Sequence, residues 1–160
     1  MAGRLFRTVD YHSNSLPANQ PLIKIALYDT GREPWPERDV LAPIDTGFSG
    51  GVMLPAQEYK FFMPSELPKR FWKEYRTMTG PLQMRTARAL MRSDATNGLE
   101  ETLVESPVLG QGKLLVGRMV LAKCRLLLDG PERSSCLMKV DSMRDPIAQS
   151  PTETARAMTK

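Results

Sequence analysis

The chain has 160 residues, a formal net charge of +4 and a hydrophobic fraction of 41%. This length suits one domain with its own core and leaves no room for two full domains. Two cysteines exclude a disulfide framework. No apolar run approaches the roughly 18 residues of a membrane-spanning helix. The N-terminus lacks the apolar segment of a signal peptide, so we expect a cytoplasmic protein that binds no membrane.

The N-terminal part of the chain is predicted to hold an arm and three strands. Residues 1–20 are polar and rich in turn formers, so we expect a loose arm. Apolar residues alternate over 22–28, which predicts a strand, and a turn is expected over 29–37, where glycine and proline occur. A returning strand is predicted over 40–44 and a short apolar strand over 52–54.

The middle of the chain is predicted to hold a helix followed by a β-hairpin. Residues 64–75 fit a helix, because Ser65 is a good N-cap and the apolar residues that follow can share one face. Thr79-Gly80-Pro81 is expected to form the turn between two strands within 76–90. A further strand is predicted over 101–108.

The C-terminal part is predicted to end the domain with short elements. These are a strand over 114–116, a short helix over 118–123 and hairpin strands over 126–128 and 136–140. Residues 141–160 are polar and are expected to form a disordered tail. Many short strands with frequent turns and little helix predict an all-β fold, a small barrel or sandwich.

One acidic loop stands out within residues 42–55. Asp45 ends an apolar strand and is followed by Thr46, by Gly47 and by two further glycines before the next apolar strand. Glycine allows close backbone approach, and the threonine hydroxyl can fix the turn. A carboxylate between two buried strands is costly unless it shares a proton or accepts hydrogen bonds. Asp45 is therefore the candidate catalytic residue.

Other catalytic sites find little support in the sequence. His12 is the only histidine and lies in the expected arm, so zinc sites and serine or cysteine triads are disfavoured. Cys124 and Cys136 are interpreted as core residues. A second Asp-Thr-Gly tripeptide, Asp29-Thr30-Gly31, is followed by charged residues and prolines and is interpreted as a plain turn.

The loop resembles the active-site loop of retropepsin-like aspartic proteases, the family of retroviral proteases and their small bacterial and archaeal relatives. The residues that carry the resemblance are Ile44-Asp45-Thr46-Gly47-Phe48-Ser49-Gly50. The family's second landmark, two apolar residues before Gly-Arg, is matched by Leu115-Val116-Gly117-Arg118. Its flap hairpin is matched by a turn at Met78-Thr79-Gly80-Pro81.

The resemblance covers residues 21–140 and implies a small closed β-barrel with one or two short helices. It also implies an aspartic endopeptidase that needs no metal or cofactor, with an extended peptide or protein as substrate. Such chemistry needs two carboxylates, and the chain offers one credible loop. Asp45 of a second copy would supply the other, so the expected enzyme is a homodimer.

Two features of the sequence leave alternatives open. Retroviral members carry an acidic residue where this chain has Ser49, so Arg118 would need another partner. Leu137-Met138-Lys139 also imitates the second landmark, with lysine in place of glycine.

The alternative function is a catalytically silent binding or assembly module with the same fold. Residues 69–92 hold seven basic side chains and one acidic one. This stretch could attract RNA or an acidic partner, although a solvated face explains it more simply. We do not expect nucleic acid to be the main partner.

Overall fold

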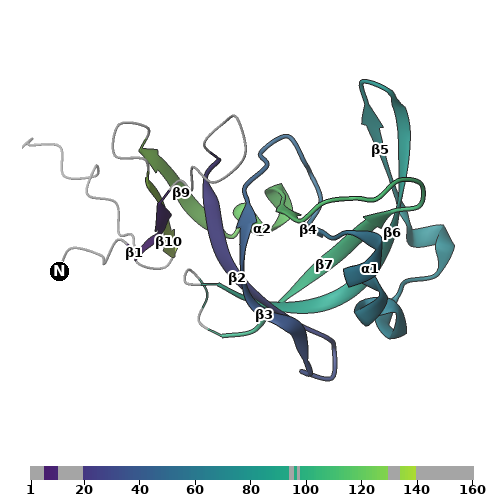
Figure 1. The fold of residues 1–160 in the computed structure, drawn as a ribbon, viewed down its shortest axis with the longest axis horizontal. Coiled ribbons are helices and arrows are strands. Elements are labelled where there is room, and N and C mark those ends of the chain that lie inside the picture. Colours follow the sequence, from purple (N-terminus) through teal and green to yellow (C-terminus); the bar gives the residue numbers. More distant parts are fainter. Residues whose placement is uncertain (1–5, 11–19, 94–95, 97, 130–133, 140–160) are drawn as a thin grey trace, which may run out of the picture.

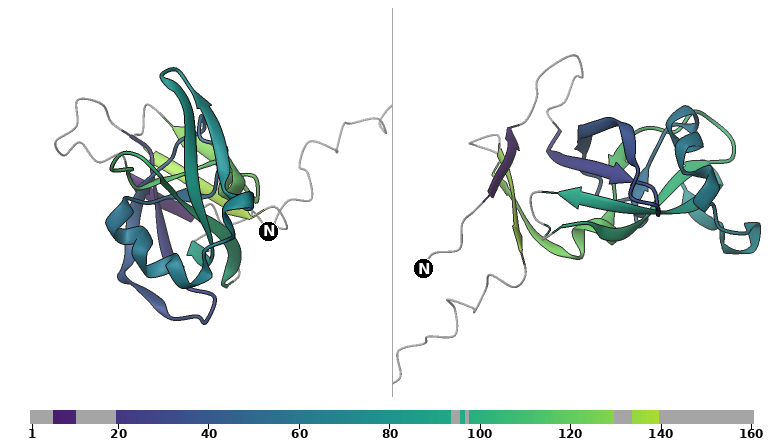
Figure 2. Two further views of the ribbon diagram at one scale, coloured as in Figure 1. Left: turned by 90° about the vertical axis from the view of Figure 1, so that its right-hand side faces the viewer. Right: turned by 90° about the horizontal axis from the view of Figure 1, so that it is seen from below.

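The computed structural model describes residues 6–10, 20–93, 96, 98–129 and 134–139, which form two sheets (Figures 1 and 2). The strands are β1 (Phe6–Asp10), β2 (Leu22–Tyr28), β3 (Pro34–Pro43), β4 (Val52–Met53), β5 (Lys73–Thr77), β6 (Gly80–Ser93), β7 (Glu100–Pro107), β8 (Leu115–Val116), β9 (Cys124–Asp129) and β10 (Ser134–Lys139). The helices are α1 (Ala56–Tyr59) and α2 (Arg118–Leu121), with 3₁₀ turns η1 (Lys60–Ser65) and η2 (Lys69–Phe71). Strands dominate the described residues and helices are few and short, so the all-β prediction is confirmed as a mostly β fold.

The larger sheet has seven strands, in the order β3-β2-β6-β7-β4-β8, and β5 pairs with β6 as the other arm of a hairpin. Strand β2 has the predicted bounds, whereas β3 begins earlier and β6 runs further than predicted. Short β4 pairs in parallel with β7 and antiparallel with β8. Among the described strands, β4 is the one that forms a ladder with β8.

The closed barrel predicted from the sequence is not confirmed. No ladder between the described strands joins the two ends of the larger sheet, β3 and β8. A single parallel bridge between Ile44 and Val116 connects them instead. The sheet thus curls until its edges meet at one point, and that point is the residue before Asp45.

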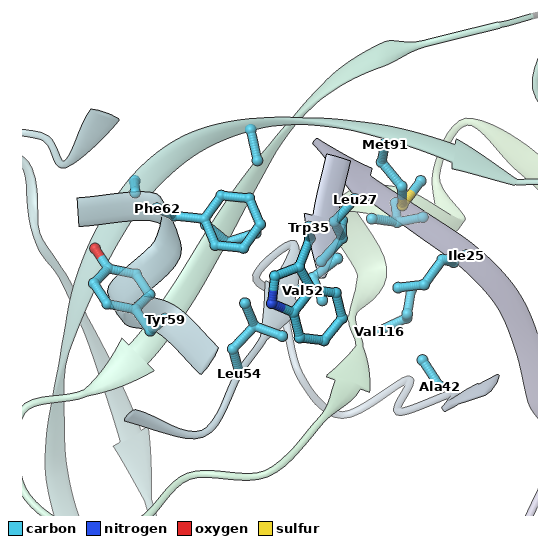
Figure 3. Packing of buried hydrophobic residues seen from close by; sticks show 14 of the residues in the cluster. Ile25, Leu27, Trp35, Ala42, Val52, Leu54, Tyr59, Phe62, Met91 and Val116 are labelled. Carbon is cyan, nitrogen blue, oxygen red and sulfur yellow. The ribbon is translucent and has the colours of Figure 1, made fainter. Parts of the chain in front are cut away.

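The hydrophobic core is formed by the larger sheet together with residues of α1, η1 and α2, and Figure 3 shows part of it. The Trp35 and Phe62 rings pack at a centroid distance of 6.4 Å. Leu54 and Val52 lie beside them and are fully buried. Burying one such large apolar side chain contributes about 1.5–3 kcal/mol, so the core provides a firm base for the loops at its edge.

The helix predicted over residues 64–75 is wrong. This segment instead holds the end of η1, then η2 and strand β5. Pro68 has no amide hydrogen, and it disfavours helical backbone at the residue before it. Leu67 accordingly leaves the helical path, and its N–H donates to the carbonyl oxygen of Thr86 at 2.9 Å. The apolar periodicity therefore reflects packing of an irregular segment and a strand.

The smaller sheet consists of β1, β10 and β9, in that order (Figure 1). Antiparallel pairing of β9 with β10 confirms the predicted hairpin. Within the expected loose arm, Phe6–Asp10 forms β1 and pairs with β10. The predicted tail over 141–160 lies outside the described residues. None of the described helices is long and apolar enough to cross a membrane.

The packing of the core predicts that two phenylalanines differ in how much they contribute to the free energy of unfolding. Phe62 is fully buried, whereas Phe71 is 53% exposed. Phe62→Ala should lower the free energy of unfolding by about 3–5 kcal/mol, because it leaves a cavity. Phe71→Ala should cost less than about 1 kcal/mol, the scale of its contact with Arg70. Urea unfolding of both variants measures the difference, and equal losses would contradict this description of the core.

Candidate active site

Asp45 lies on a partly exposed loop that follows β3. Its Oδ1 atom accepts hydrogen bonds from the N–H of Gly47 at 2.8 Å and of Phe48 at 3.2 Å. Its own N–H donates to the carbonyl oxygen of Val116 at 2.9 Å. Within the described residues, no hydrogen bond engages Oδ2. The loop thus fixes one carboxylate oxygen and leaves the other available to a reactant.

The junction of β8 with α2 braces this loop from behind. Val116 pairs with Val52 on one side and forms the bridge to Ile44 on the other. The N–H groups of the next residues, Gly117 to Met119, donate to carbonyl oxygens within the loop at 2.7, 2.8 and 3.0 Å. The structure therefore brings Leu115–Arg118, the predicted second landmark, against the Asp45 loop.

The alternative landmark, residues 137–139, lies elsewhere. It belongs to β10, which pairs with β9 and β1 in the smaller sheet. Of the two candidate segments, only the one that contains Gly117 contacts the loop in the hydrogen bonds of the described residues.

Close packing at the junction requires a glycine at position 117. A Cβ atom there would overlap the carbonyl oxygens of Phe48 and Gly50 and the ring of Phe48. Ser49 and Arg118 are both exposed, and Arg118 forms no ion pair with a described carboxylate. Backbone hydrogen bonds rather than a side-chain ion pair hold this part of the site.

The predicted flap is the hairpin of β5 and β6, which projects from the body of the molecule (Figures 1 and 2). Met78 at its tip is fully exposed. Thr77 fixes the turn, since its hydroxyl donates to the carbonyl oxygen of Gly80 at 2.7 Å and accepts from the N–H of Thr79 at 3.3 Å. Gly80 has a φ of +118°, a conformation that favours glycine, and Pro81 pairs with β5.

Sequence reasoning missed a buried carboxylate behind the loop, that of Glu105 in β7. Its side chain is fully buried. Gly51 N–H donates to it at 3.2 Å and the Tyr75 hydroxyl at 2.6 Å, and Lys73 Nζ lies 3.6 Å away. Burial and the bond to Glu105 raise the pKa of Tyr75, so its hydroxyl stays protonated and donates. Glu105 follows the core residue Val104, so the alternation of the strand places it on the opposite face. Polar residues on that face are usually exposed to solvent, so the sequence gave no sign that this carboxylate is buried.

The remaining candidates lie away from the loop. Asp29 sits in a tight turn, as predicted, with its Oδ1 accepting from the N–H of Glu33 at 2.8 Å. Cys124 is half-buried; burial and nearby Glu100 raise the pKa of its thiol, which makes it a weak nucleophile. His12 and the side chain of Cys136 lie outside what the structure describes. No metal-binding cluster of His, Cys, Asp or Glu occurs in the described part of the chain.

Comparison with known proteins finds no matching family model and no matching curated protein. Among solved structures, the chain is similar to the EIAV protease complexed with the inhibitor HBY-793, with 12% sequence identity and a TM-score of 0.41. The similarity covers 71% of this chain and 92% of that chain. The described residues define a mostly β protein in which the loop that carries a partly exposed carboxylate contacts the base of a projecting hairpin through Phe48 and Tyr75.

The tight junction predicts that Gly117→Ala displaces the Asp45 loop. The added methyl group must push Phe48 and the loop backbone away, so we expect a loss of about 1–3 kcal/mol in the free energy of unfolding. Gly31→Ala is the matched control, because its Cβ would meet only the movable Asp29 side chain. Chemical denaturation and the amide shifts of residues 45–51 report the outcome. Unchanged shifts in the Gly117 variant would contradict the brace.

Proposed function

We propose that this chain is an aspartic endopeptidase whose active site is completed by a second copy of itself. The observation that carries the proposal is the state of Asp45: one oxygen is held by two backbone N–H groups, and the loop is braced by the residues around Gly117. This support keeps a carboxylate in one orientation, as a proton-transfer group requires. The retropepsin-like arrangement of residues 21–140 is part of the same proposal.

The chemistry needs a pair of carboxylates. Two Asp45 side chains facing each other across a twofold axis would share one proton, because like charges about 3 Å apart cannot both ionise. The ionised member removes a proton from a water molecule, and the protonated member donates a hydrogen bond to the scissile carbonyl. Thr46, which is exposed at the tip of the turn, is available to contact the partner loop.

The hairpin of β5 and β6 supplies the cover for the substrate. Its projecting tip, from Met78 to Gly80, offers backbone groups to an extended peptide, which would bind as an added strand. Closure over the peptide would exclude bulk solvent from the site while the reacting water molecule stays between the carboxylates. The expected substrate is therefore an unfolded or extended protein segment.

The binding-module alternative receives less support. Three of the seven basic side chains in 69–92 pair with carboxylates: Lys73 with Glu105, Arg85 with Glu66, and Arg92 with Asp39. Pairing removes part of the charge that would attract RNA or an acidic partner. The stretch is also divided between η2, β5 and β6.

The decisive test compares the two Asp-Thr-Gly sites. Asp45→Asn should reduce hydrolysis of an unfolded protein substrate at least a thousandfold, since the dyad loses its proton-accepting carboxylate. Asp29→Asn should leave the rate within about twofold, because Asp29 only closes a turn. Peptide release is measured between pH 4 and pH 7, with folding checked by circular dichroism. An Asp45 variant with normal activity would refute the proposal.

A second prediction concerns concentration. If each copy supplies half of the dyad, specific activity should fall on dilution as the dimer dissociates, and the Asp45 variant should inhibit wild-type protein by forming mixed dimers. Activity assays across a dilution series, paired with sedimentation, measure both effects. Constant specific activity in a monomer would contradict a shared site.

A further inference from the structure

Three contacts join the flap hairpin to the Asp45 loop through one buried carboxylate. Glu105 accepts a hydrogen bond from Gly51, at the end of the loop, and another from Tyr75, in β5. Lys73, also in β5, lies 3.6 Å from the same carboxylate. We infer that Glu105 is a positioning residue that couples the flap hairpin to the Asp45 loop; this inference rests on the proposed function.

The burial of Glu105 requires an explanation. A fully buried charge is costly unless several donors compensate it. Here the donors come from two different elements, and Glu105 itself lies on a central strand, paired with Thr86 on one side and Met53 on the other. Its backbone is therefore fixed, and its carboxylate is a rigid anchor between the two elements.

Packing around Gly50 adds a second link between the same elements. The ring of Phe48, in the loop, meets the ring of Tyr75 edge-on at a centroid distance of 5.2 Å. A Cβ atom on Gly50 would overlap Phe48, Glu105 and the Tyr75 hydroxyl. The three side chains thus converge on one backbone position, so Tyr75 and the loop backbone cannot move independently.

The contacts divide the hairpin into a fixed base and a free tip. Tyr75 is anchored, whereas Met78 is fully exposed. The base sets the position from which the tip closes, and the same anchor sets the end of the loop that carries Asp45. Substrate binding by the flap and orientation of the carboxylate therefore share one determinant, the carboxylate of Glu105.

Tyr75→Phe tests the coupling with the least change in shape. It removes one hydrogen bond to a charged group, so kcat/KM should fall about tenfold. The matched control is Tyr59→Phe, which removes a similar bond of 3.0 Å from a buried tyrosine, donated to Glu66 and not to Glu105. That variant should keep kcat/KM within about twofold.

The division between KM and kcat separates positioning from simple loss of stability. Loss of folded protein lowers the apparent kcat and leaves KM unchanged. We expect Tyr75→Phe to raise KM at least threefold, because the flap no longer closes from its anchored position. Adding Tyr75→Phe to Glu105→Gln should have little further effect, since both act through one contact. An unchanged KM, or fully additive losses, would overturn the inference.

Amide hydrogen exchange tests the coupling without any catalysis. In Tyr75→Phe, the N–H groups of Gly51 and Phe48 should exchange about tenfold faster than in the wild type, and Tyr59→Phe should leave them unchanged. If exchange responds in this way while the wild type cleaves no peptide, the proposed function fails and the coupling stands. Unchanged exchange in Tyr75→Phe overturns the coupling whether or not the protein is a peptidase.

Discussion

The site depends on the hydrogen bonds between the β8–α2 junction and the Asp45 loop. Gly117 N–H meets the carbonyl oxygen of Gly51 at 2.7 Å, and the next two N–H groups bind further carbonyl oxygens of the loop. A glycine-rich loop has many conformations, and restricting it costs conformational entropy. The junction offsets this entropic cost with hydrogen bonds between backbone groups, so no side chain is needed to hold the loop. The orientation of the carboxylate follows from that restriction.

The two carboxylates of this region, Asp45 and Glu105, differ in burial and in hydrogen bonding. Among the described residues, only one Asp45 oxygen accepts hydrogen bonds, and the side chain is partly exposed. Glu105, in contrast, is fully buried and accepts hydrogen bonds from the loop and from β5. The exposed group is suited to a reaction, and the buried group is suited to holding parts together. Replacing Glu105 leaves buried donors without a partner, which makes the anchor costly to lose.

Local patterns predicted what depends on local chemistry. Strand β2 and the turn at Thr79-Gly80-Pro81 followed from alternation and from the Thr-Gly-Pro sequence. The resemblance stated for the sequence drew attention to Leu115-Val116-Gly117-Arg118, which the structure places against the Asp45 loop. The helix over 64–75 failed because the effect of Pro68 outweighed apolar periodicity. Glu105 and the pairing of β1 with β10 involve residues distant in sequence. Patterns within one short stretch of sequence do not reveal which distant stretch it will contact, so these contacts could not be predicted.

The parallel pairing of β4 with β7 has a consequence for the order of folding. Strand β4 has only two residues, and its partners, Val104 and Val116, are made long after it. Contacts between residues so distant in sequence form slowly, because a long segment must first be closed into a loop. A growing chain cannot hold the Asp45 loop in place before Met119 has been added. The carboxylate therefore becomes ordered only after a segment about 70 residues further along the chain has been made, so no chemistry at this site can precede the synthesis of that segment.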